Sequence, residues 1–196
     1  MGNPLPLEFN NFYHIYSRGN NKVNIFLEDR NYEFFKVRYV KYINTIADTF
    51  LAFCFLKNHF HLLIKIKPEE EIRSLLQEMG KVDDISKVPS SQFSHLLNSY
   101  SKAINKAYDR TGNLFQRPFQ RKLILTSDQL FGTIAYIHQN PIKHQFTDDT
   151  RDWVWSSFYE VYCQQYQIID LKIIEEYFGS RENYLSIAYP MEEADE

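Results

Sequence analysis

Residues 58–67 read NHFHLLIKIK, and this stretch decides the fold. Its even positions, from Phe60 to Ile66, are all apolar, whereas its odd positions hold two histidines, one leucine and two lysines. Because successive side chains of a β-strand point to opposite faces, this period of two predicts a strand with one buried face. His59 and His61 are placed together on the other, more polar face.

The segments before this strand predict two further strands of the same sheet and a helix between them. Residues 49–57 (TFLAFCFLK) are apolar on both faces, which is typical of a central strand, and a tight turn at Lys57-Asn58 would pair them with residues 59–67. Residues 12–18 (FYHIYSR) alternate and stop at a Gly-Asn-Asn turn, so they predict a first strand. Between these strands, residues 28–48 carry apolar side chains at helical spacing.

Downstream, the pattern predicts helices from Pro68 to about residue 79 and over 92–110, separated by a loop at 80–91. Residues 113–125 should be extended, and a helix should begin at Ser127 and end at Asn140, before Pro141. The order of elements predicts an α+β fold: a ferredoxin-like (split βαβ) antiparallel sheet with helices on one face.

We expect residues 1–147 to form the catalytic domain. Residues 148–196 are expected to form an acidic helical extension, packed on it or trailing from it.

The charge is distributed unevenly along the 196 residues. The chain has a net charge of -3, but residues 1–147 carry 19 Lys+Arg and 13 Asp+Glu, whereas the rest carry 3 and 12. A body of +6 followed by a tail of -9 is compatible with binding a polyanion.

Cys54 and Cys163 lack the spacing of a zinc site. Without a signal peptide or a long apolar run, a cytoplasmic protein that does not contact the membrane is expected.

His59 and His61 are the first candidates for chemistry. Two imidazoles at i and i+2 on a strand could share one divalent ion, with a third ligand from elsewhere. Lys65 continues the same face and would give the strand a positive edge toward a phosphate. The alternative is a pair of strand histidines that hold no ligand.

Tyr136 and Asn140 are the second candidates. They lie one helical turn apart, away from the apolar stripe of the helix, so both could face one site. A tyrosyl oxygen attacks phosphorus well when a base or a cation helps it to ionise. The alternative is that Tyr136 is a packing residue.

The third candidate is the segment of residues 102–122, which mixes basic and aromatic side chains. Cations can neutralise phosphates while rings stack on unpaired bases, so this segment is a candidate nucleic-acid interface. A solvated helix face followed by a strand with core phenylalanines is equally compatible with the pattern. The candidate DNA-binding residues are Lys65 together with Phe115, Arg117, Phe119, Arg121 and Lys122.

Five segments in order give the chain a specific resemblance. NHFHLLIKI resembles the HUH motif, His-hydrophobic-His, of the single-tyrosine, single-strand DNA transposases, and YIHQNPIKH resembles the catalytic helix of their REP-associated branch. The segments FYHIYSRGNN, GNLFQRPFQRK and WSSFY agree in order as well. Together they span roughly residues 12–160. Residues 80–91 are expected to be an insertion relative to the family, between the histidines and Tyr136. The acidic tail after 160 matches no part of the family.

The resemblance implies a function. His59, His61 and Asn140 would be ligands of Mg²⁺ or Mn²⁺, Tyr136 would be the nucleophile, and the partner would be single-stranded DNA folded into imperfect hairpins. A 5′-phosphotyrosine and a free 3′-OH would form and later rejoin, with no nucleotide cofactor. Some relatives exchange the tyrosine helix between two subunits, whereas the REP-associated branch is expected to be monomeric, so a monomer or a homodimer is possible.

Two other functions remain open. A domesticated protein could bind hairpin DNA or RNA on the same sheet without cutting it, and would need neither the metal nor Tyr136. A phosphoesterase could use the two histidines on RNA without a covalent step.

Overall fold

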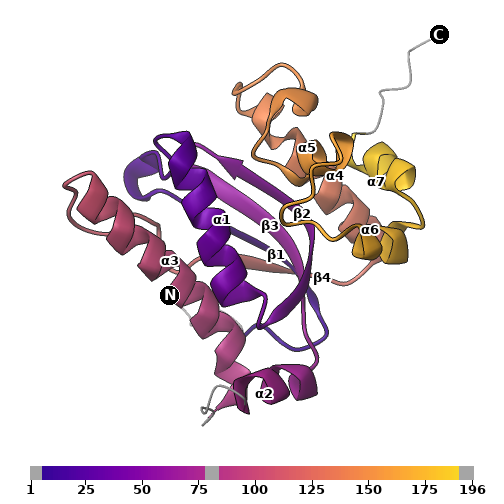
Figure 1. Cartoon of the computed structure of the whole chain (residues 1–196), viewed down its shortest axis with the longest axis horizontal. Helices are drawn as coiled ribbons and strands as arrows, with labels where there is room; N and C mark the ends of the chain where they lie inside the picture. The colour runs from indigo at the N-terminus through magenta and orange to yellow at the C-terminus, as the bar shows by residue number, and fades with distance from the viewer. Residues whose placement is uncertain (1–5, 78–83, 190–196) are drawn as a thin grey trace.

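A computed structural model describes residues 6–77 and 84–189. Four antiparallel strands form one sheet in the order β2-β3-β1-β4, and helices cover both of its faces (Figure 1). The elements are β1 (Phe12–Arg18), η1 (Asn20–Lys22), α1 (Asp29–Ile43), β2 (Ala47–Leu56), β3 (His59–Ile66), α2 (Glu69–Gln77), η2 (Ile85–Lys87), α3 (Val88–Ala107), β4 (Gln120–Ile124), α4 (Ser127–Lys143), η3 (Thr150–Asp152), α5 (Ser157–Tyr162), α6 (Leu171–Phe178) and α7 (Arg181–Ala188).

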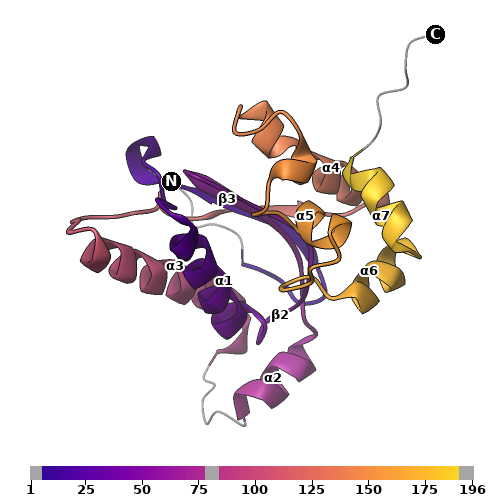
Figure 2. The same cartoon turned by 45° about the horizontal axis from the view of Figure 1, so that its top comes forward.

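The predicted α+β, ferredoxin-like antiparallel sheet is confirmed, with β1 and β3 in its middle. The helices differ from the expectation of one covered face. Helices α1 and α3 lie on one side of the sheet, and α4 lies with α5, α6 and α7 on the other (Figure 2). The second layer exists because α4 packs on β2 and β3, and the C-terminal helices then pack on α4 and β2.

Aromatic side chains fill the interface between the sheet and helices α1 and α3. Phe35 of α1 lies 5.3 Å, between ring centroids, from both Phe55 of β2 and Phe60 of β3. Tyr100 of α3 packs edge-on against Phe35, with its hydroxyl donating to the Ile25 carbonyl at 2.7 Å. Such ring pairs add about 0.5–1.5 kcal/mol each beyond the area they bury. Phe60 therefore anchors β3 from behind while its histidines point to the other face.

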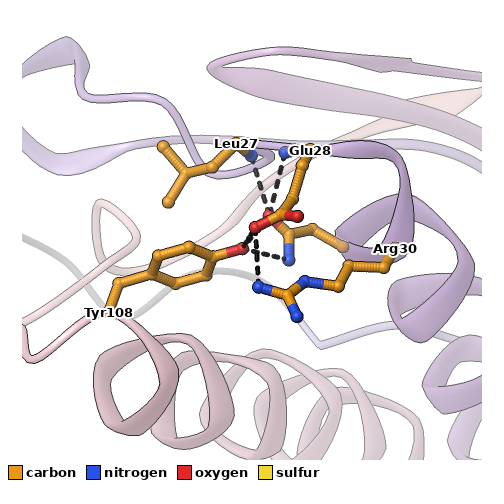
Figure 3. Close-up of polar contacts among 5 residues, drawn as sticks. Leu27, Glu28, Arg30 and Tyr108 are labelled. Carbon is orange, nitrogen blue, oxygen red and sulfur yellow. Dashed lines mark hydrogen bonds and ion pairs between the residues drawn. The ribbon is translucent and has the colours of Figure 1, made fainter.

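The N-terminus of α1 is tied to the C-terminal end of α3 (Figure 3). Glu28 and Asn31 form a capping box, in which the Asn31 side chain accepts from the backbone N–H groups of Leu27 and Glu28. The hydroxyl of Tyr108, just after α3, donates to the Glu28 carboxylate. This bond lowers the pKa of Glu28, as does the neighbouring Arg30. Tyr108, one of the rings in the basic and aromatic segment, thus has a structural role.

Strand β2 is an edge strand by hydrogen-bonded order, not the central strand that its apolar sequence predicts. The difference arises because the segment after η3 covers its outer edge: the Phe55 N–H donates to the Trp155 carbonyl at 2.9 Å, and Cys54 forms an isolated bridge with Ser156. Trp153 Nε1 also donates to the Phe55 carbonyl at 3.0 Å. An edge covered in this way is protected against pairing with another chain.

Two further boundaries differ from the sequence expectations. Helix α3 begins at Val88, with Pro89 in its first turn, so the expected loop at 80–91 is shorter; its residues 80–83 lie outside the described part of the chain. Between residues 113 and 125, only Gln120–Ile124 form a paired strand. Among residues 6–77 and 84–189, no helix has the length and apolar character needed to cross a bilayer.

Ser157 joins the C-terminal helices to the sheet, and its loss should destabilise the protein. Its buried Oγ accepts from the Phe53 N–H at 2.8 Å and lies 2.6 Å from His138 Nε2. We expect Ser157→Ala to lower the free energy of unfolding by about 1–3 kcal/mol, because polar groups remain buried without a partner. Urea denaturation measures this change. Ser186→Ala, which removes an exposed hydroxyl of α7, is the control and should have little effect; equal values for the two variants would contradict the role of Ser157.

Candidate active site

Helix α4 continues through Pro141 to Lys143, so the predicted end at Asn140 is wrong. Proline disfavours a helical conformation in the residue before it. Here the Asn140 side chain donates to the Tyr136 carbonyl at 2.6 Å, and the His144 N–H donates to the Asn140 carbonyl at 2.9 Å. The extra turn places Lys143 and His144 on the same face as Tyr136 and Asn140.

The helix is fixed on both sides. Its buried stripe includes Ile134 and Ile137, which are completely inaccessible to solvent. On the same helix, His138 bonds to Ser157, and its carbonyl accepts from the Thr150 hydroxyl at 3.2 Å. Burial lowers the pKa of His138 to about 3, so this histidine is neutral and serves packing. The rotation of α4, and hence the direction of Tyr136, is thereby determined.

His59 and His61 lie side by side on β3, with ring centroids 5.1 Å apart. Both side chains are buried, with 7% and 5% of their surface exposed. His59 Nδ1 lies 2.6 Å from the side-chain oxygen of Asn58, which can only accept, so Nδ1 carries the hydrogen and Nε2 carries the lone pair. The Nε2 atom of His61 is buried without a hydrogen-bond partner in the described part of the chain.

Tyr136 and Asn140, both on α4, lie next to these two histidines. The Tyr136 ring packs edge-on against His61, with 5.5 Å between ring centroids, and remains 40% exposed. Asn140 is fully buried, and its Oδ1 lacks a partner among the described residues. The helix and the strand therefore bring together, within one chain, the four residues that the sequence singled out.

His59, His61 and Tyr136 line a cavity of about 380 Å³, whereas Asn140 is not among its lining residues. Burial lowers the pKa of His59 to about 4; His144 and Arg18 act in the same direction and the nearby Asn140 acts against them. Burial also lowers the pKa of His61 well below its usual value, with His14 as the next contribution. Both imidazoles are consequently neutral near pH 7, which is the form that binds a metal. The cavity is lined by Tyr16, Ser17, Arg18, His59, Phe60, His61, Gln116, Pro118, Gln120, Tyr136 and His144.

The donor set fits a divalent cation with an incomplete protein shell. Two neutral imidazoles and the orphaned amide oxygen of Asn140 would leave coordination positions for water and phosphate oxygens. No cluster of three His, Cys, Asp or Glu side chains within residues 6–77 and 84–189 could hold a metal ion. A third protein ligand would therefore have to be a group of another kind, and the unpartnered Oδ1 of Asn140 is the candidate.

The predicted DNA-binding cations are divided between the two faces of the sheet. Lys122 pairs with His14 in the register of β1 and β4, so it is exposed on the histidine face. Arg121 lies on the opposite face, where it donates to Ser90 at 2.8 Å, and Arg117 donates to Asn98 at 2.6 Å. Both arginines line a second cavity of about 520 Å³ beside α3. Lys65 shares the histidine face, but it donates to the Tyr177 hydroxyl of α6 at 3.1 Å.

Phe115 and Phe119 are largely buried, although both border the cavity beside α3, and their stacking on bases stays a prediction. Only 3% and 6% of their surfaces are exposed. Phe115 packs against Phe60, and Phe119 packs against Phe93 of α3. The aromatic half of the segment belongs to the core because residues 113–119 close the end of the sheet.

Four residues near the site escaped sequence reasoning. His14 lies 2.9 Å, Nε2 to Nδ1, from His61, and the His144 ring lies 4.7 Å from that of His59. Lys143 Nζ lies 5.4 Å from the centre of the Tyr136 ring, and Arg18 pairs with His59 in the register. His144 follows Asn140 by four residues and Lys143 follows Tyr136 by seven, so helical spacing could have identified both. His14 and Arg18 required the pairing of β1 with β3.

Comparison with known proteins supports the resemblance. No family model matches the chain. A curated protein of Haemophilus influenzae, provisionally named a REP-associated tyrosine transposase, is 28% identical over 111 residues, which are 56% of this chain. The match spans 58% of that protein's length, somewhat under two thirds of it.

A solved structure has the same fold. It is a REP-associated tyrosine transposase bound to a REP hairpin, with a TM-score of 0.62 and 18% sequence identity. The superposition covers 87% of this chain and 90% of the other. The resemblance predicted from the ordered motifs is therefore confirmed by sequence and by fold.

The buried position of Phe119 generates a prediction. We expect Phe119→Ala to lower the free energy of unfolding by about 3–5 kcal/mol, because truncating a core phenylalanine leaves a cavity. Chemical denaturation measures the loss, and Phe131→Ala, at a ring that is 37% exposed on α4, should cost clearly less. A Phe119→Ala protein of unchanged stability that had lost affinity for single-stranded DNA would instead support the stacking role.

Proposed function

We propose that this protein cleaves and rejoins single-stranded hairpin DNA through a covalent bond between Tyr136 and a 5′-phosphate. One observation carries the proposal: Tyr136 packs against His61 of the same chain, over a cavity that contains both strand histidines. The similarity to REP-associated tyrosine transposases supports a DNA substrate. The solved relative is bound to a hairpin, which supports a folded single strand.

His59, His61 and Asn140 would hold Mg²⁺ or Mn²⁺. When bound, such a cation polarises the scissile phosphate and offsets the charge that develops on its oxygens. The neutral state of the imidazoles and the buried, unpartnered atoms His61 Nε2 and Asn140 Oδ1 support this assignment. Residues 1–147 would then contain the whole catalytic set, and the described part of the extension, residues 148–189, would support α4 through η3 and α7.

Tyr136 would act as the nucleophile. Its oxygen forms a bond to phosphorus while the bond from phosphorus to the 3′ oxygen breaks, so the strand ends in a free 3′-OH. The leaving oxygen takes up one proton and the tyrosine loses one, and the number of phosphoester bonds is unchanged. A later attack by a 3′-OH reverses the step, so no nucleotide cofactor is required. Lys143 Nζ lies 5.4 Å from the centre of the Tyr136 ring and would place a positive charge beside the phosphate that Tyr136 attacks.

The DNA strand would cross the histidine face. Arg18 borders the cavity, and Lys122 and Lys143 extend the positive charge along the strand and the helix. Because Arg117 and Arg121 line the cavity beside α3 and not the cavity at the histidines, they would contact a different part of the DNA from the scissile phosphate. One chain contains both Tyr136 and the histidine pair, which supports a catalytically competent monomer.

Replacing Tyr136 tests the covalent step. In Mn²⁺ with labelled hairpin DNA, the unmodified protein should give a shifted protein–DNA band on a denaturing gel. Tyr136→Phe should remove this band while DNA affinity stays within about twofold, because the ring and its packing remain. Tyr162→Phe, at an exposed tyrosine of α5, is the matched control and should form the adduct normally.

The same gel distinguishes the alternatives. Cleavage without a band would indicate a phosphoesterase, and the absence of both cleavage and a band would indicate a domesticated binder. A band that persisted in Tyr136→Phe would show that another residue is the nucleophile.

Lys122 provides a test of the strand path. We expect Lys122→Gln to weaken single-strand binding, and to reduce the slope of log affinity against log salt by about 0.7 if one phosphate contact is lost. Fluorescence anisotropy over a salt series measures both values. Lys172→Gln, which removes the same charge from an exposed position on α6, should leave the slope unchanged; equal effects of the two changes would argue against this path.

A further inference from the structure

His14 lies beside the two candidate metal ligands but belongs to another strand. Its Nε2 atom is 2.9 Å from His61 Nδ1, and both side chains are buried, with 7% and 5% of their surface exposed. The two rings are nearly parallel, with an interplanar angle of 29° and centroids 5.1 Å apart. His14 thus contacts His61 at Nδ1. The other ring nitrogen of His61, Nε2, is the one without a partner among the described residues.

This hydrogen bond has two possible directions with different consequences. If His61 donates through Nδ1, its Nε2 atom carries a lone pair that can bind a cation. If His14 donates, His61 must carry its own hydrogen on Nε2, which then cannot be a ligand. The direction of one buried bond therefore decides whether His61 can act as a metal ligand.

The unpartnered Nε2 atom of His61 favours His14 as the acceptor. A hydrogen on that buried nitrogen would be a donor without a partner among the described residues, and buried N–H groups without a partner are rarer than unpaired acceptors. The rings of Tyr16 and Tyr136 pack against His14 at 5.0 and 5.9 Å between centroids, which restricts its rotation. His14 contacts both the candidate nucleophile and a candidate ligand.

We propose that His14 is a positioning residue that accepts the hydrogen of His61 Nδ1 and so directs the Nε2 lone pair of His61 to the divalent cation. The inference rests on the proposed function, because it presupposes a cation at His59, His61 and Asn140. Partners that fix the tautomer of a metal-binding histidine typically change metal affinity 10–100-fold when removed. His14 would do here what a carboxylate or a carbonyl does in other metal sites.

The first measurement is the affinity of the full chain for Mn²⁺ without DNA, by electron paramagnetic resonance titration. His14→Leu, which removes the acceptor, should weaken binding 10–100-fold. His14→Gln can present an amide oxygen near the position of Nε2, and should stay within about threefold of the unmodified protein. The control is His95→Leu on α3, whose ring lies 6.3 Å from Tyr42; it should bind Mn²⁺ normally.

The second measurement reads the tautomer directly in the unmodified protein without metal. Long-range ¹H–¹⁵N NMR correlations should show His61 with its hydrogen on Nδ1, and His14 with an unprotonated Nε2. This result does not depend on whether His14→Leu folds.

The outcomes separate this inference from the proposed function. If the unmodified protein failed to bind Mn²⁺, the proposed metal site would be wrong, and the role of His14 with it. If it bound Mn²⁺ and a folded His14→Leu bound it equally well, the metal site would stand and the inference would fail. A hydrogen on His61 Nε2 in the NMR spectrum would also overturn it.

Discussion

The packing of α4 across β2 and β3 is the interaction on which the candidate active site depends. Ile134 and Ile137 are fully buried in this contact, and the bond between His138 and Ser157 fixes the helix to the C-terminal layer. Without this contact, Tyr136 would have no defined position relative to His61. The C-terminal helices are therefore part of the physical basis of the site, although they contribute none of its proposed reactive groups.

The parts of the site that could be predicted from the sequence are those that follow a local period. The alternation around His59 and His61 places both rings on one face of β3, and the spacing of Tyr136 and Asn140 places them on one face of α4. These two periods are geometric consequences of the strand and the helix. Motif order then identified the resemblance that sequence and fold comparison support.

The remaining features depend on contacts between distant segments, which no local period contains. β2 resembles a central strand because the segment around Trp155 covers its edge from about 100 residues further along the chain. Phe115 and Phe119 are buried because residues 113–119 close one end of the sheet, and Lys65 is engaged by Tyr177 of α6. The partnership of His14 with His61 likewise follows from strand pairing.

The most direct test of the covalent mechanism is to locate the bond between protein and DNA. Trypsin should release residues 123–143 as one peptide, since Lys122 and Lys143 flank it, and Tyr136 is its single tyrosine. After reaction with hairpin DNA in Mn²⁺ and nuclease trimming, mass spectrometry should find the residual nucleotide attached to this peptide. Attachment to any other peptide would contradict the assignment of Tyr136 as the nucleophile.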